Sequence, residues 1–414
     1  MLAWFVAHPF LSRLIVVLVA LFVAWLINYA IVTQSYRPRP IGAWSPLPAG
    51  ASRRNWIDWL PIIGWWRMRR ESQVHGDRFW LRPLLIEIGF PLAMLWLYDA
   101  HTTGKLLPAA RLAVNMQAEL HCEFISHFVL IALMTVATFI DFDEQLIPDT
   151  ITLPGTLFGL IGSASFVAWF PLIPFAMTMA EMDAASRFTW PTSLNGRWGL
   201  ATALSIVAIW SFALLDRIWI TRRGWSRAPK YFLAGVFRTR WWLIVTALWI
   251  VVSAGVILAW WLPIARWQYL LSALIGLACA GGITWAVRVA ARMALRVEAL
   301  GFGDVTLMAM IGTFIGWQPS LIVFFVAPLI AVVIFAGRYL LSGNGAGPYG
   351  PYLCMATVVV TVFWDFFEKS YAAPILALPA WVTFVILGLA VVMLGAMLWI
   401  WRLIVGTVRG LRHR

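Results

Sequence analysis

Apolar runs of about 20 residues recur along the 414-residue chain and alternate with short polar stretches. A helix of that length crosses a hydrocarbon core of roughly 30 Å, and helices satisfy their own backbone hydrogen bonds there. The pattern predicts eleven such helices, or ten by a stricter count. Their approximate ranges are 12–34, 84–99, 122–140, 150–172, 197–215, 241–262, 268–290, 305–317, 319–341, 351–364 and 376–402. We therefore expect an all-α polytopic membrane protein with about 10–11 transmembrane helices.

Composition supports this class of protein. Hydrophobic residues make up 62% of the chain and charged residues 12%, whereas soluble domains carry roughly 25% charged residues. The formal net charge is +13, but the basic residues lie between apolar runs and form no single patch. The lipid bilayer is therefore the expected partner, and no nucleic acid is expected.

The distribution of basic residues predicts the orientation of the chain. Cytoplasmic loops of membrane proteins carry an excess of Lys and Arg. With the N-terminus outside, most of the 31 basic residues fall inside, including nine Arg in the loop at 34–82. This places the C-terminus in the cytoplasm and locates the protein in the inner (cytoplasmic) membrane. The apolar run at 14–32 is too long for a secretory signal and is expected to be the first span.

Two motifs place acidic residues beside apolar runs, IDFDEQLIPD at 140–149 and GFGD at 301–304, both expected at the cytoplasmic face. Ionisable groups beside membrane spans are costly and often functional. Asp141 and Asp304 can form a dyad in which one carboxyl group keeps a proton and the other activates water. The dipole of the helix after GFGD favours the charged form of Asp304.

Each acidic residue also has an ordinary structural interpretation. Asp304 and Asp149 each precede an apolar run and are well placed to cap a helix. Asp143 and Glu144 are typical of a solvated turn. Taken singly, these residues favour capping or solvation over catalysis, and only the two motifs together favour catalysis.

The motifs IDFDEQLIPDTITLP and EALGFGDVTLMAMIGTFIGW closely resemble those of the bacterial type IV prepilin peptidase family of GxGD-type aspartic peptidases. Further similar segments are LINYAI at 26–31, RFWLRPLLIE at 78–87 and GPYGPYL at 347–353. The resemblance implies an endopeptidase that removes the leaders of type IV prepilins or type II secretion pseudopilins at the cytoplasmic membrane face. It implies Asp141 and Asp304 as catalytic residues. Supporting residues would be Gly301, Gly303, Asp143, Pro148 and Asp149.

The loop at 34–82 departs from the family pattern. The family usually has two CxxC pairs there, whereas this loop contains no cysteine, and the chain has only three cysteines, far apart in sequence. His75, the one soft ligand in the loop, is expected to be solvated. We therefore expect no metal site and no cofactor for the peptidase. N-methylation of the product with S-adenosylmethionine, the family's second activity, is left open.

Two further departures lie near Asp304. Thr306 stands where the family usually has Lys. The two aspartates are also separated by two extra spans, which indicates an inserted hairpin at about 173–264. The expected organisation is an N-terminal region at 1–121, a peptidase core at 122–364 that contains this hairpin, and an extra span with a basic tail at 365–414.

Two other functions fit parts of the pattern. A polytopic transporter with broken helices at GFGD and at 342–351 would use the same glycines, but matching short segments in two halves are not evident. A presenilin-like peptidase shares the GxGD motif, but its first aspartate normally follows Tyr, and here Ile140 precedes Asp141. The sequence does not indicate the oligomeric state.

Overall fold

The computed structural model describes residues 8–37, 41–47, 53–103, 117–165, 192–215, 240–261, 264–295, 300–342 and 347–372, with scattered positions between 382 and 396. The regular elements of this part of the chain are all helical. The long helices are α2 (Pro9–Thr33), α5 (Leu81–Thr102), α6 (Gln117–Glu144), α7 (Asp149–Ser165), α8 (Arg197–Ala213), α10 (Trp241–Trp260), α11 (Ile264–Leu295), α12 (Phe302–Ile315), α13 (Trp317–Ser342) and α14 (Gly350–Val362).

These ten helices coincide with the first ten expected spans. The eleventh, at 376–402, lies mostly outside the described residues, as does most of the polar part of the expected hairpin at 173–264. Six described helices are long and apolar enough to cross a membrane, or seven if the bent pair formed by α14 and Trp364–Tyr371 is one span. This count is below ten because α7, α8 and α12 have only 17, 17 and 14 residues.

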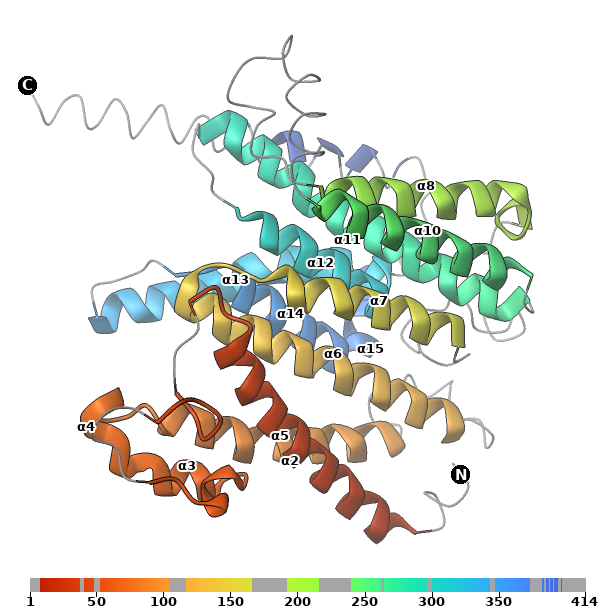
Figure 1. Cartoon of the computed structure of the whole chain (residues 1–414). Coiled ribbons are helices and arrows are strands. Elements are labelled where there is room, and N and C mark those ends of the chain that lie inside the picture. The colour runs from red at the N-terminus through yellow and green to blue at the C-terminus, as the bar shows by residue number, and fades with distance from the viewer. Residues whose placement is uncertain are drawn as a thin grey trace, which may run out of the picture.

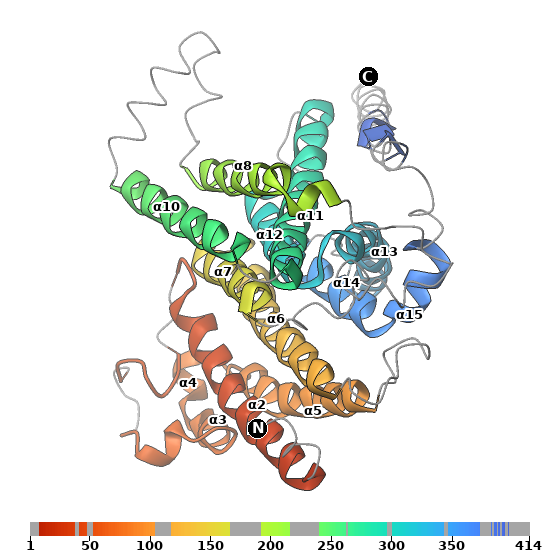
Figure 2. The same ribbon diagram turned by 90° about the vertical axis from the view of Figure 1, so that its right-hand side faces the viewer.

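The helices form three groups (Figures 1 and 2). Helices α2 and α5 pack against each other and against α6, with the loop helices α3 (Ile63–Met68) and α4 (Ser72–His75) beside them. Helices α6, α7, α12, α13 and α14 form the centre. Helices α8 and α10 pack together beside α11, and α10 exposes most of its side chains.

Helix α12 lies at the centre of this arrangement. Every residue from Asp304 to Ile315 is buried, and the helix packs against α7, α11, α13 and α14. Its backbone approaches α11 closely, because a Cβ atom on Gly276 or Gly312 would clash with the opposite backbone. The helix ends at Gly316, whose φ of 76° is unstrained only for glycine. Asp304 of the GFGD motif is thereby fixed in the first turn of a helix enclosed by protein.

Candidate active site

Asp141 lies in the last turn of α6 with its side chain buried. Its Oδ2 accepts a hydrogen bond of 3.1 Å from the backbone N–H of Gly350, the first residue of α14. The first N–H groups of a helix have no partner within the helix and are aligned with its positive dipole end. The start of α14 therefore holds the Asp141 carboxylate in place.

Asp304 lies in the first turn of α12, and its side chain is also buried. Its Oδ2 accepts a hydrogen bond of 3.1 Å from the backbone N–H of Gly301, the N-cap residue. A carboxylate at this third position, reaching back to the N-cap, is half of a capping box. The structural interpretation of Asp304 is thus correct in part, and it explains why its carboxylate is fixed in one orientation.

The two carboxylates interact electrostatically although they are 163 residues apart in sequence. Arg288 from α11 also acts on Asp304, and it donates a 3.0 Å hydrogen bond to the carbonyl of Leu300, next to the GFGD motif. A helix start thus faces each aspartate, α14 for Asp141 and α12 for Asp304. The dipole argument that favoured Asp304 as the charged member therefore does not distinguish the two.

Ile147 joins the three motifs that surround the aspartates. A Cβ atom on Gly303 would lie 3.0 Å from the Ile147 side chain and 3.2 Å from its backbone. A Cβ atom on Gly350 would lie 2.8 Å from Ile147 Cδ1 and 2.5 Å from Asp141 Oδ2. A side chain at Gly350 would force the ends of Ile147 or Asp141 to shift, and one at Gly303 would press on Ile147, because IPD, GFGD and GPYGP pack closely against one another.

Asp143 and Glu144 do not lie in a solvated turn, so that expectation was wrong. Arg82 of α5 donates to both oxygens of Asp143 at 2.7 and 2.9 Å. Glu144 accepts the backbone N–H groups of Tyr36 and Arg37, each at 2.8 Å. Both residues anchor the end of α6 to the N-terminal helices, which suits a supporting role.

The remaining expected residues lie around the same turn. Pro148 is buried, and its carbonyl accepts the N–H of Ile151 at 3.1 Å. Asp149 is the first residue of α7 and is exposed. Thr306 donates its hydroxyl to the Gly303 carbonyl at 3.0 Å, within its own helix. The Thr306 hydroxyl is therefore used in a hydrogen bond within the first turn of α12.

Tyr349 is a residue near the dyad that the sequence did not single out. It is the N-cap residue of α14 and is half-buried. Burial, and the Asp304 carboxylate in addition, raise the pKa of its hydroxyl, so it stays protonated at neutral pH. Tyr349 belongs to the segment GPYGPYL, which resembles the family. Its proximity to Asp304 depends on how α12 and α14 pack, and the sequence does not show that packing.

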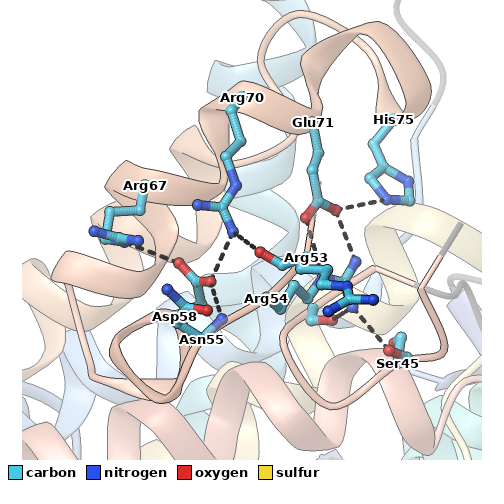
Figure 3. A network of polar contacts seen from close by, with 10 residues as sticks. Ser45, Arg53, Arg54, Asn55, Asp58, Arg67, Arg70, Glu71 and His75 are labelled. Atoms are coloured by element: carbon cyan, nitrogen blue, oxygen red, sulfur yellow. Dashed lines mark hydrogen bonds and ion pairs between the residues drawn. The ribbon is translucent and has the colours of Figure 1, made fainter. Parts of the chain in front are cut away.

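The loop at 34–82 is held by ion pairs in place of cysteines (Figure 3). Arg54 makes two hydrogen bonds to Glu71, at 3.0 and 2.7 Å. Asp58 pairs with Arg67 at 3.0 Å and with Arg70 at 2.7 Å. The expectation that His75 is solvated was wrong, because only 7% of its side chain is exposed, and it lies 3.5 Å from Glu71 Oε2.

A cavity of about 300 Å³ separates this loop from the end of α6. Its walls include the aromatic rings of Trp65 and Phe79, with Arg78, Arg82 and Asp143 among its charged residues. The cavity therefore adjoins the turn that carries Asp143.

Comparison with known proteins gives partial matches. Residues 233–336 match the Type IV leader peptidase family. The chain is 29% identical over 107 residues to a prepilin leader peptidase/N-methyltransferase of Aeromonas salmonicida, covering 25% of this chain and 37% of that protein. A protein of the same name from Aeromonas hydrophila is 28% identical over 102 residues, covering 24% of this chain and 35% of that protein. No solved structure matches.

The matched range contains Asp304 and the whole GFGD motif, but it does not contain Asp141. The comparisons therefore do not test a pairing of Asp141 with Asp304. The alignments span little more than a third of the length of the curated relatives. Within these bounds, the comparisons confirm that this multi-pass membrane protein resembles the type IV prepilin peptidase family, as its aspartate motifs predicted.

Proposed function

We propose that the protein is an aspartic endopeptidase of the inner membrane that cleaves the leaders of type IV prepilins or type II secretion pseudopilins. The observation that carries this proposal is that Asp141 and Asp304, both buried, lie where the motifs IPD, GFGD and GPYGP pack against one another. Two neighbouring carboxylates favour a state that holds one proton between them. The charged member then takes a proton from water as the water attacks the peptide carbonyl, and the protonated member supplies a hydrogen bond to that oxygen.

The surroundings of Asp141 suit an apolar substrate. Phe142 and Leu146, close to Asp141 in sequence, are 44% and 54% exposed. A prepilin segment consists of a short basic leader followed by an apolar helix, so this surface would receive the helix beside the dyad. The basic loops do not suit a basic leader, and we attribute them to topology and anionic lipid.

The test is leader cleavage by purified protein in proteoliposomes, with the organism's own prepilins or pseudopilins as substrates. Asp141→Asn and Asp304→Asn should each abolish cleavage, because a single amide removes the proton that the pair shares. Asp143→Asn and Glu144→Gln are the matched controls and should reduce cleavage only mildly. Near-normal cleavage by either catalytic variant would disprove the dyad.

The same assay examines methylation. The peptidase step needs no cofactor, whereas methylation requires S-adenosylmethionine. The cavity beside Trp65 and Phe79 has a volume at the lower end of the range for ligand pockets. We propose it as the binding site for S-adenosylmethionine in the methylation reaction. Mass spectrometry of product N-termini, with and without S-adenosylmethionine, should then show one added methyl group that Trp65→Ala removes.

A further inference from the structure

Three buried metal-ligating side chains meet between α5 and α6, away from the aspartates. They are His101 in the last turn of α5, and Glu123 and His127 in the first half of α6. Each is 1% exposed. One ligand atom from each lies within 4.8 Å of the other two. His101 Nε2 is 2.9 Å from His127 Nδ1 and 3.6 Å from Glu123 Oε1.

The orientation of His101 is that of a metal ligand. Its Nδ1 lies 2.8 Å from the carbonyl oxygen of Leu97, which can only accept a hydrogen bond. Nδ1 therefore carries the hydrogen, and the lone pair of Nε2 points into the cluster. Histidines that bind metals usually donate their other N–H to a carbonyl or carboxylate in this way.

His127 turns its Nδ1 toward the cluster, because this is the atom that lies 2.9 Å from His101 Nε2. A neutral imidazole carries its hydrogen on one ring nitrogen and a lone pair on the other. With the hydrogen on Nε2, the Nδ1 lone pair of His127 faces the Nε2 lone pair of His101, and a cation between them would accept both.

We propose that His101, Glu123 and His127 bind a divalent transition-metal ion, preferably Zn²⁺, between α5 and α6. Two imidazoles and one carboxylate are a common ligand set for Zn²⁺, with Zn–N distances of about 2.0–2.1 Å. Tetrahedral ligand atoms at that distance lie about 3.3 Å apart, which falls between the observed 2.9 and 3.6 Å. Mg²⁺ and Ca²⁺ prefer oxygen ligands and are disfavoured by the imidazoles.

The site is structural and does not take part in leader cleavage. His127 and Asp141 are 14 residues apart on one helix, which at 1.5 Å per residue is about 21 Å. Its ion would join α5 to α6 at the end opposite the dyad. The inference is therefore independent of the proposed function. It departs from the expectation of no metal site, which rested on the absence of CxxC pairs and did not consider His101 and His127, 26 residues apart in sequence.

Metal analysis of the full-length protein tests the proposal. Protein purified in detergent, loaded with ZnCl₂ and desalted should contain one Zn²⁺ per chain by inductively coupled plasma mass spectrometry. His101→Gln, Glu123→Gln and His127→Gln should lose that ion. His121→Gln is the matched control, because His121 is buried on the same helix but contacts Tyr98 and lies outside the cluster. It should keep the full zinc content.

A second measurement covers the case in which the variants do not fold. Metal-depleted wild-type protein titrated with Co²⁺ should develop the visible absorption of tetrahedral cobalt, saturating at one equivalent and disappearing when Zn²⁺ is added. Substoichiometric zinc in the loaded wild type, equal zinc in the cluster variants, or no saturable cobalt absorption would each overturn the proposal.

Discussion

The backbone N–H of Gly350 donates a 3.1 Å hydrogen bond to the carboxylate of Asp141, across 209 residues of sequence. This contact joins the start of α14 to the end of α6 and fixes one member of the proposed dyad. A Cβ atom on Gly350 would lie 2.5 Å from that same oxygen. The first prediction follows from this distance.

Gly350→Ala should lower the rate of leader cleavage on the order of 100-fold, since displacing a catalytic group by about 1 Å has that effect. Membrane insertion should be unchanged. Gly337→Ala on α13 is the matched control, because a Cβ atom there meets nothing within 4 Å. Equal cleavage rates for the two variants would show that the Gly350 contact does not position Asp141.

The N-terminal region depends on Glu87, which is fully buried. Its carboxylate accepts hydrogen bonds from Asn28 Nδ2 at 3.0 Å, Trp65 Nε1 at 2.9 Å and the Ile62 N–H at 2.5 Å. Glu87→Ala leaves these buried donors without an acceptor, at a cost of about 1–3 kcal/mol for each that stays unsatisfied. We expect a clearly lower unfolding midpoint in detergent. Asp77→Asn, at an exposed position of the loop at 34–82, should unfold like the wild type.

The loop at 34–82 should be sensitive to acid through Asp58. Burial alone would raise the pKa of this carboxyl, but hydrogen bonds from the Asn55 N–H, Arg67 and Arg70 outweigh it and lower the pKa. A depressed folded-state pKa stabilises the fold above the unfolded value of about 3.9, and this stabilisation is lost as pH falls through the folded pKa.

Hydrogen exchange should therefore be faster across 53–71 in Asp58→Asn than in the wild type at pH 7. The difference should persist to about pH 4 and shrink below it. Asp77→Asn again serves as the control. A difference that shrank already between pH 7 and pH 5 would contradict the depressed pKa.

Cysteine labelling should establish the orientation of the chain. In a background without Cys122, Cys279 and Cys354, a cysteine at position 181 should react with an impermeant reagent from outside, and one at position 227 from inside. Both positions lie outside the described residues. An even number of added spans keeps Asp141 and Asp304 on one face. Labelling of position 227 only from outside would refute the expected topology.

The hydrophobic pattern predicted the described helices well, because a span long enough to cross lipid must be apolar throughout. The pattern did not predict that α12 is enclosed by other helices, since a buried helix and a lipid-facing helix are both apolar. The predicted count of eleven spans therefore included buried and lipid-facing helices without distinction.

The site was predictable only in part. Asp141 and Asp304 stood out because charges beside membrane spans are rare. The contact of Ile147 with Gly303 and Gly350, and the position of Tyr349 near Asp304, depend on three helix ends meeting in space. The spacing of residues along the chain carries no information about such tertiary contacts. For the same reason, the sequence did not show that His101 lies beside Glu123 and His127, although Glu123 and His127 are one helical turn apart.

The cysteine-free loop at 34–82 has a consequence for the conditions under which the protein keeps its shape. A loop held by thiolates around zinc would lose its order when oxidants convert thiolates to sulfenic acids or disulfides. The pair of Arg54 and Glu71 has no oxidisable atom, and with side-chain exposures of 8% and 1% it is largely shielded from dissolved ions. This ion pair should therefore tolerate both oxidative stress and high salt.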